Sequence, residues 1–426
     1  MRRSLLALLG VLVVLAAGFA VVAWHPDIAP VAPPSRSAFD PALVRRGAEL
    51  ASLGYCASCH TAADGRAYGG GRPLATPFGT IYGTNISPDP DSGIGRWSLA
   101  AFRRAMREGL DRAGHNLYPA FPYDHFTRLS DDDIGALYAF LMTRDPAHAD
   151  TPPNALPFPY NLRPLLAGWN LLFLKEGPFS PDPAKDALWN RGAYLAEGPS
   201  HCGGCHTPRN SLGAEQASRA FDGGEAEGWW APPLNATSPA PVPWTEDDLF
   251  TYLRAWDPRH GGAAGPMAAV ADDLAQVPEA DIRAIAHYIA SLMGPPSTER
   301  LKQAEALAAR PPPDTTHDPD LAAGAAIYDG LCAVCHESAG QVPFTLRSLA
   351  QHTALAAPDP RNVLQAIRGG IRPPEGEAGP IMPAFAGVLS DKQTADLLRY
   401  LRARFSDRPP WSDVGGWVAR SGGAGS

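Results

Sequence analysis

The chain has 426 residues and a mass of 45.1 kDa, a length that favours about two to four domains over one small module. Apolar residues make up 45% of the chain and charged residues 19%, which is typical of a folded protein. The formal net charge is −8, so we expect no basic surface that could neutralise a phosphate backbone. Composition and charge therefore exclude nucleic acid as the expected partner.

An uninterrupted apolar segment, residues 5–24, follows Arg2 and Arg3 at the start of the chain. As a helix it is long enough to cross a hydrocarbon layer of about 30 Å, whereas a cleaved signal peptide has a shorter apolar core of about 7 to 15 residues. The positive charges keep the amino terminus in the cytoplasm. We expect an uncleaved transmembrane anchor over 1–24, in preference to a signal peptide, with the remaining chain on the periplasmic side of a bacterial inner membrane.

The six cysteines form three pairs with the same local pattern, Cys-x-x-Cys-His. The three motifs are Cys56, Cys59 and His60, then Cys202, Cys205 and His206, then Cys332, Cys335 and His336. Two thiols at this spacing can each add to one vinyl group of a porphyrin, and the imidazole that follows then binds the iron. The motifs predict three covalently bound haem c groups, each with its histidine as one axial ligand.

Other uses of paired cysteines fit the sequence less well. Structural zinc needs four ligands close in space, and each pair stands 130 or 146 residues from the next with no second ligand pair beside it. A thiol–disulfide exchanger or a disulfide framework would not place a histidine after every second cysteine. We therefore expect neither zinc nor disulfide chemistry.

A helical pattern repeats around the three motifs. An opening helix with a Gly-Ala pair precedes each motif, at Gly47, Gly192 and Gly324. A middle helix follows, capped by Ser98 in the first copy and by Thr245 in the second, where Asp248 completes a capping box. The closing helices carry the pairs Phe140-Leu141, Tyr288-Ile289 and Tyr400-Leu401. We expect each closing helix to pack against its opening helix.

The repeat predicts a mainly α fold with three consecutive haem domains behind the amino-terminal helix. Pro-rich stretches mark the boundaries and should form extended, stiff linkers. The predicted segments are the anchor 1–24, domain 1 over 38–145, a Pro-rich linker over 146–183, domain 2 over 184–294, a Pro-rich linker over 295–316, domain 3 over 317–408 and a loosely ordered tail over 409–426. The apolar stretch 165–174 is too short to span a bilayer. We expect it to pack between domains, with a partner groove or the membrane surface as the alternative.

Two of the six methionines lie on Pro-rich loops between a middle and a closing helix. Met267 follows His206 by 61 residues, and Met382 follows His336 by 46 residues. A thioether is the usual sixth ligand of an electron-transfer haem, because it raises the reduction potential and closes the coordination sphere. We therefore predict Met267 and Met382 as the sixth ligands of the second and third haems.

The first copy lacks such a methionine. Phe121 stands 61 residues after His60, and a phenyl ring cannot bind iron. His125, four residues further along the same loop, is the nearest group that can, so we predict bis-histidine ligation of the first haem by His60 and His125. The alternatives are His115 or an open sixth position. Without a methionine, the first haem should have the lowest potential of the three.

These motifs together resemble the three-haem cytochrome c subunits of bacterial membrane-bound dehydrogenases. Besides the haem motifs, the resemblance rests on the runs TNISPD (84–89), GIGRWS (93–98), LRP (162–164) and NLLF (170–173), and it covers nearly all of 40–405. The family includes the cytochrome subunits of periplasmic alcohol, aldehyde and gluconate dehydrogenases. Its members usually carry Met where Phe121 stands. The form FPYDHF (121–126) is similar to the cytochromes that serve molybdenum hydroxylases of the nicotinate, isoquinoline or aldehyde type.

The resemblance implies cytochrome c-like domains and an electron-transfer role. A catalytic dehydrogenase subunit with molybdenum, flavin or a quinone cofactor would oxidise a small organic molecule, and the haems would pass its electrons to quinone or another respiratory acceptor at the membrane. No nucleotide-binding, zinc-hydrolase or serine-hydrolase motif occurs, so we expect no substrate site in this chain. Two alternatives are a peroxidase-like enzyme with an open first haem and a scaffold or sensor with structural haems.

Overall fold

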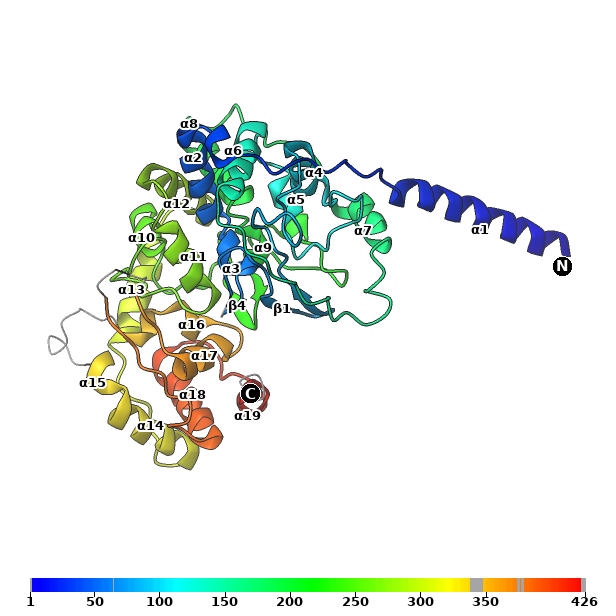
Figure 1. Ribbon diagram of the computed structural model, residues 1–426. Helices are drawn as coiled ribbons and strands as arrows, with labels where there is room; N and C mark the ends of the chain where they lie inside the picture. Colours follow the sequence, from blue (N-terminus) through cyan, green and yellow to red (C-terminus); the bar gives the residue numbers. More distant parts are fainter. Residues whose placement is uncertain (1, 64, 338–347, 374–375, 377–378, 423–426) are drawn as a thin grey trace. The chain divides into compact units, whose positions relative to one another are not determined.

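A computed structural model describes the chain except residues 1, 64, 338–347, 374–375, 377–378 and 423–426 and the side chains of 2, 8, 12, 15, 16 and 422 (Figure 1). The chain divides into two compact units. Unit 1 comprises Met1–Ala184, Tyr194–His201 and Ser211–Ala214, and unit 2 comprises Lys185–Ala193, Cys202–Asn210 and Glu215–Ser426. Unit 1 therefore holds the first repeat, and unit 2 holds the third repeat and most of the second.

Unit 1 is mainly helical. Its elements are α1 (Arg2–Ala23), η1 (Arg36–Ala38), α2 (Pro41–Leu53), α3 (Cys56–His60), β1 (Pro73–Thr76), β2 (Gly79–Tyr82), α4 (Leu99–Glu108), α5 (Tyr123–Phe126), α6 (Asp131–Met142) and α7 (Leu165–Phe173). Asp40, Ser98 and Ser130 cap α2, α4 and α6 by accepting backbone N–H groups of the first helical turn. The opening, middle and closing helices of the first repeat are therefore α2, α4 and α6.

Unit 2 contains the third version of the same pattern and the second version apart from residues 194–201, which include the end of α8, and 211–214. The second has α8 (Ala187–Glu197), α9 (Gly203–His206), η2 (Ala217–Arg219), β3 (Gly224–Ala226), β4 (Trp229–Ala231), α10 (Glu246–Tyr252), α11 (Pro266–Leu274) and α12 (Glu279–Met293). The third has α13 (Thr298–Ala308), α14 (Pro319–Leu331), α15 (Ala333–His336), η3 (Leu349–Gln351), α16 (Thr353–Ala356), α17 (Arg361–Gly369), α18 (Asp391–Phe405) and α19 (Val414–Gly422). The capping box predicted for Thr245 and Asp248 is present at the start of α10.

In each repeat the opening and closing helices touch backbone to backbone at the predicted glycine. A Cβ on Gly47 would lie 2.0 Å from the carbonyl oxygen of Ala136. The same distance is 2.0 Å between Gly192 and Ala284 and 2.2 Å between Gly324 and Asp396. Since real Cβ atoms do not come this close to an oxygen, only glycine permits this helix packing. The expected pairing of opening and closing helices is confirmed.

The aromatic member of each closing pair lies beside this glycine. The hypothetical Cβ atoms would be 2.6 to 2.8 Å from the Cβ atoms of Phe140, Tyr288 and Tyr400. Tyr288 and Tyr400 are 3% and 1% exposed, so each aromatic ring fills the space next to the close approach. The glycine of the Gly-Ala pair and the aromatic residue of the closing pair therefore take part in the same helix–helix contact.

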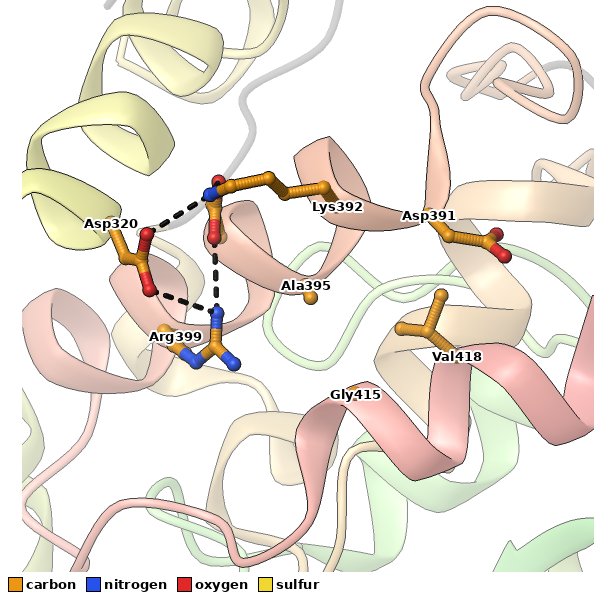
Figure 2. A pocket seen from close by; sticks show the side chains of 8 residues that line it. Asp320, Asp391, Lys392, Ala395, Arg399, Gly415 and Val418 are labelled. Carbon is orange, nitrogen blue, oxygen red and sulfur yellow. Dashed lines mark hydrogen bonds and ion pairs between the residues drawn. The ribbon is translucent and has the colours of Figure 1, made fainter.

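Ion pairs join the same helices at their ends. Arg46, next to Gly47, donates through Nε to Asp133 of α6 at 3.0 Å, and Arg191, next to Gly192, donates through Nε to Asp281 of α12 at 2.8 Å. In the third repeat, residues at other positions of the two helices form the ion pairs. Figure 2 shows Lys392 and Arg399 of α18 reaching Asp320 of α14 at 2.9 and 3.7 Å.

A short antiparallel hairpin follows the haem motif in the first two repeats. Strand β1 pairs with β2 in the register Pro73↔Tyr82, and β3 pairs with β4 in the register Gly224↔Ala231. Within unit 2, β4 also meets the third repeat. The amide of Asn362 in α17 accepts from the Trp230 N–H at 2.9 Å and donates to the Trp230 carbonyl at 2.8 Å. This contact joins the second repeat to the third.

The linkers are not extended throughout, and the tail is not loosely ordered, in contrast to what we expected. The second linker contains α13, because Ser297 caps a run rich in strong helix formers. The first linker contains α7, and its residue Ala155 exchanges two backbone hydrogen bonds with Thr80 of β2. In the tail, Trp411 and Val418 are 7% and 1% exposed and belong to the core of the third repeat. Apolar side chains at helical spacing make the tail part of the fold.

Helix α7 packs within unit 1 through one of its faces. Asn170 accepts a hydrogen bond from the Tyr123 hydroxyl at 2.7 Å, and Trp169 donates to the Leu212 carbonyl at 3.0 Å. Leu171 and Leu172 are instead 75% and 69% exposed. The expectation that this segment packs is therefore met by one face, while the other face is apolar and open.

Among the residues and side chains described above, no helix combines the length and the apolarity required to cross a membrane.

The glycine contact leads to a stability prediction. Replacing Gly47 by Ala should cost about 1 to 3 kcal/mol of unfolding free energy, because the new methyl group forces α2 and α6 apart. Gly135 is the matched control, since it lies within α6 and a Cβ there would meet no atom within 4 Å. Gly135→Ala should stabilise the helix by up to about 1 kcal/mol. Urea unfolding followed by circular dichroism measures both variants, and equal effects would contradict the packing argument.

Candidate functional site

The first two Cys-x-x-Cys-His motifs form one helical turn each, immediately after the opening helix. The first motif makes up the whole of α3, and the last four residues of the second motif make up α9. Five of the six cysteine side chains are partly buried, and Cys335 is exposed. Each pair therefore presents two sulfur atoms beside an imidazole on the same turn, as attachment to one porphyrin requires.

The motif histidines of the first two repeats have equivalent hydrogen bonds. His60 Nδ1 lies 2.6 Å from the carbonyl oxygen of Thr84, and His206 Nδ1 lies 2.7 Å from that of Pro232. A carbonyl oxygen can only accept, so Nδ1 carries the proton and Nε2 keeps its lone pair. This is the tautomer that binds a metal through Nε2.

Burial supports the same state of the rings. Desolvation lowers the pKa of His60 and outweighs the Thr84 carbonyl, which raises it. The pKa of His206 is lowered for the same reason, against the effect of the Pro232 carbonyl. Both imidazoles are therefore neutral at neutral pH, and a neutral ring is what an iron ligand needs.

The hairpins bring the two carbonyl groups to the histidines. Thr84 follows β2, and Pro232 follows β4. The chain at one end of each hairpin passes close to the motif. A Cβ on Gly83, after β2, would lie 1.9 Å from the Cys59 carbonyl oxygen, and one on Gly224, at the start of β3, would lie 2.4 Å from that of Cys205. Glycine is therefore required where each hairpin crosses its haem motif.

The third motif is built in the same place after α14, but its described contacts differ. His336 Nδ1 is buried and has no hydrogen-bond partner among the described residues, which leave out 338–347 directly after the motif. Burial lowers the pKa of His336, and Glu337 opposes this shift. The Glu337 carboxylate forms an ion pair with the Arg404 guanidinium of α18, with a nitrogen–oxygen distance of 2.6 Å. Burial and then the neighbouring Cys335 raise the pKa of the Cys332 thiol to about 11.

The two methionines predicted as sixth ligands are held by different structures. Met267 is the second residue of α11, rather than a loop residue as we expected, because Pro266 starts a helix after Gly265. A Cβ on Gly265 would lie 2.2 Å from the indole of Trp229, so the hairpin packs against the start of α11. Met382 exchanges both backbone hydrogen bonds with Ile371 and packs against the third core.

The candidate ligands of the first haem lie in different surroundings. His125, in α5, is 8% exposed, and its Nδ1 lies 2.8 Å from the Glu197 carbonyl oxygen. Phe121 packs against the cluster of Tyr123 and Trp169 and is 5.4 Å from the Phe126 ring. His115 is on the surface with its side chain 65% exposed and its Nδ1 3.2 Å from Asp111. Of the two histidines, His125 is the buried one with a fixed ring.

Several residues of these sites could not be recognised from the sequence motifs. The carbonyl groups of Thr84 and Pro232 are backbone acceptors and have no side-chain signature. Tyr55 and His201, whose rings lie 4.6 Å apart, were also not predicted. Their common position, directly before the first cysteine of a motif, was the available signal.

Three segments of the chain match known families. Residues 44–145 and 190–293 match Cytochrome c, and residues 319–401 match Cytochrome C oxidase, cbb3-type, subunit III. These segments coincide with the three repeats. The helical repeats and their Cys-x-x-Cys-His turns thus define a c-type cytochrome, a protein whose domains bind haem c covalently.

Similar proteins narrow this class to a family. The fructose dehydrogenase cytochrome subunit of Gluconobacter japonicus is 36% identical over 405 residues, which are 89% of this chain and 82% of that protein. The gluconate 2-dehydrogenase cytochrome c subunit of Pantoea cypripedii is 35% identical over 383 residues, 86% of each chain. A nicotinate dehydrogenase subunit of Pseudomonas putida is 46% identical over 402 residues, 93% of this chain, but the chain spans only 33% of that protein. The chain belongs to the family of cytochrome c subunits of bacterial dehydrogenases.

Proposed function

We propose that this chain carries three haem c groups and transfers electrons from the catalytic subunit of a periplasmic dehydrogenase to quinone or another respiratory acceptor. The observation that carries the proposal is the repeated turn in which a neutral imidazole follows two cysteine thiols. His60 and His206 have the same Nδ1 hydrogen bond, at 2.6 and 2.7 Å from a carbonyl oxygen. A site repeated in this way serves a cofactor rather than a substrate.

The bound haem would supply one-electron redox chemistry, while the chain supplies position and electrostatics. The cysteines would hold the porphyrin edge, and Thr84 and Pro232 would orient the imidazoles. Met267 and Met382 are our proposed sixth ligands for the second and third haems, and His125 for the first. Filled coordination spheres would exclude other ligands from the iron, which suits electron transfer.

The partner is proposed from the relatives. Their names identify nicotinate, fructose, alcohol and gluconate dehydrogenases. The run from Phe121 to Phe126 and the 46% identity to the nicotinate dehydrogenase protein favour a catalytic subunit of the molybdenum hydroxylase type over a flavin or quinoprotein subunit. Quinone is proposed as the acceptor because one relative is named alcohol dehydrogenase (quinone), cytochrome c subunit.

A membrane location is also part of the proposal. The apolar residues 5–24 follow two arginines, and in α1 the side chains of Val14 and Val21 are 71% and 76% exposed. Exposed apolar surface on this scale is unfavourable in water. Phe19 of α1 lies 3.9 Å from where a Cβ on Gly168 of α7 would be, so the open face of α7 continues the same apolar surface. We propose that α1 anchors the chain in the inner membrane and that the other domains are periplasmic.

The function is tested on the full chain expressed with the cell's haem-attachment machinery. The mass of the denatured protein should exceed that of the polypeptide by three haems, and Cys202→Ala with Cys205→Ala should remove one of them. In the complex purified with its catalytic subunit, nicotinate or another of the relatives' substrates should reduce the haems, as seen in their optical spectrum. A bare polypeptide mass, bound zinc, or haems that no substrate reduces would refute the proposal.

The sixth ligands have separate tests. Met267→Ala and Met382→Ala should each lower one haem's potential by roughly a hundred millivolts, a fraction of the ~0.8 V range set by axial ligands. His125→Ala should convert one low-spin haem to high-spin in the electron spin resonance spectrum. Met106→Leu is the control, because Met106 is 5% exposed within α4 and the change conserves volume. A high-spin first haem already present in the unmodified protein would favour the peroxidase-like alternative.

The anchor is tested by fractionation. The full chain should stay with the membranes through high-salt and carbonate washes, because burial of about 20 apolar residues is not disrupted by salt. A variant in which a cleavable export signal replaces residues 1–24 should be released into the periplasm. Release of the unmodified chain by salt alone would show that α1 is not an anchor.

A further inference from the structure

The residues that directly precede the first and second haem motifs are in contact with each other. Tyr55 is bonded to Cys56, and His201 is bonded to Cys202. The two rings, both in unit 1, have their centroids 4.6 Å apart, and the Tyr55 hydroxyl lies 3.1 Å from His201 Nδ1. Side chains beside two different haem motifs are therefore in direct contact and joined by a hydrogen bond.

The backbone at both positions is strained in the same way. Tyr55 has φ 34° and His201 has φ 35°, in the left-handed region that residues with a Cβ rarely adopt. Such a conformation costs on the order of 1 to 2 kcal/mol and persists where the surrounding structure requires it. The third motif has Leu331 at this position, within α14 and 40% exposed. The strained aromatic position is thus a property of the first two motifs.

The surrounding contacts keep the pair in place. The Tyr55 N–H donates to the Ser52 carbonyl at 3.0 Å, and the His201 N–H donates to the Gly198 carbonyl at 3.2 Å. His201 is 7% exposed, and the Phe126 ring packs edge-on against it at 5.4 Å. Tyr55 is partly buried, and both residues are held by backbone hydrogen bonds, so the two rings keep a constant separation, which an electron-transfer contact needs.

We propose that the contact between Tyr55 and His201 is the electron path between the first and second haems. This inference rests on the proposed function, which places haems on Cys56 and Cys202. The path runs from one thioether through Cys56 and Tyr55, across the hydrogen bond to His201, and through Cys202 to the second thioether. The bound haems would supply the one-electron chemistry, in which the iron that gives up the electron would go from Fe²⁺ to Fe³⁺ and the iron that takes it up from Fe³⁺ to Fe²⁺. No proton moves, and neither side chain is itself oxidised.

The lower potential proposed for the first haem gives the path a direction, from the first haem to the second. Electron transfer becomes slower when a gap replaces bonded or hydrogen-bonded atoms. Tyr55 and His201 would therefore act as positioning residues that shorten the gap, while the haems carry the charge. The third haem, which has Leu331 at this position, would receive electrons by another route.

The test removes the rings without straining the backbone. Glycine tolerates the φ angles of both positions, so Tyr55→Gly and His201→Gly delete the side chains and relieve strain. A photoexcited flavin delivers one electron to the oxidised full-length holoprotein, and the absorbance changes then report its redistribution among the haems. Each variant should slow the phase between the first and second haems by roughly tenfold, with both reduction potentials unchanged. Tyr55→Phe, which keeps the ring and loses the hydrogen bond, should give a smaller decrease.

The matched control is Leu331→Ala, which changes the equivalent position of the third motif and should leave this phase at its original rate. Unchanged kinetics in both glycine variants, with three haems attached, would overturn the proposed path alone. So would shifted potentials that account for the whole change in rate. Fewer than three haems in the unmodified protein would overturn the proposed function and this inference together, so the two failures are distinguishable.

Discussion

The close contact between the opening and closing helices is the constraint on which the rest of the structure depends. At Gly47, Gly192 and Gly324 the two helices approach so closely that a methyl group would overlap a carbonyl oxygen. Each haem motif begins within a few residues of the end of its opening helix. Fixing the helix pair therefore fixes where the cysteines and the histidine lie. A small haem domain has little core of its own, so this one contact positions most of its site.

Much of this arrangement could be predicted because it depends on side-chain signals. The Gly-Ala pairs, the aromatic pairs and the cap at Thr245 all indicate local contacts, and the structure contains them. The hairpins were not predicted, since strands of three or four residues carry too little pattern. Proline content also misled us at α13, where a run of helix-forming residues decides the structure. The tail was expected to be loosely ordered as a chain terminus, but α19 forms because its apolar side chains pack on the third core.

The same distinction applies to the sites. Cysteine and histidine spacing identifies the attachment motifs, but the tautomer of His60 is set by a backbone carbonyl that no residue type reveals. The sixth position of the first haem is harder, because Phe121 only shows which ligand is absent. The structure adds that His125 is buried and oriented by the Glu197 carbonyl, whereas His115 is exposed. The residue types identify His125 and His115 as candidate ligands, and the two differ in that only His125 is buried.

The amide of Asn362 has a consequence for how this protein can be divided. Its side chain forms hydrogen bonds with both the N–H and the carbonyl of Trp230, so a short strand of the second repeat is bound to a helix of the third. An excised second repeat would leave that strand edge open to water or to another chain. Three similar sequence units therefore do not amount to three interchangeable modules. Any rearranged or shortened chain would have to keep the contact between Asn362 and Trp230, which is visible only in the folded structure.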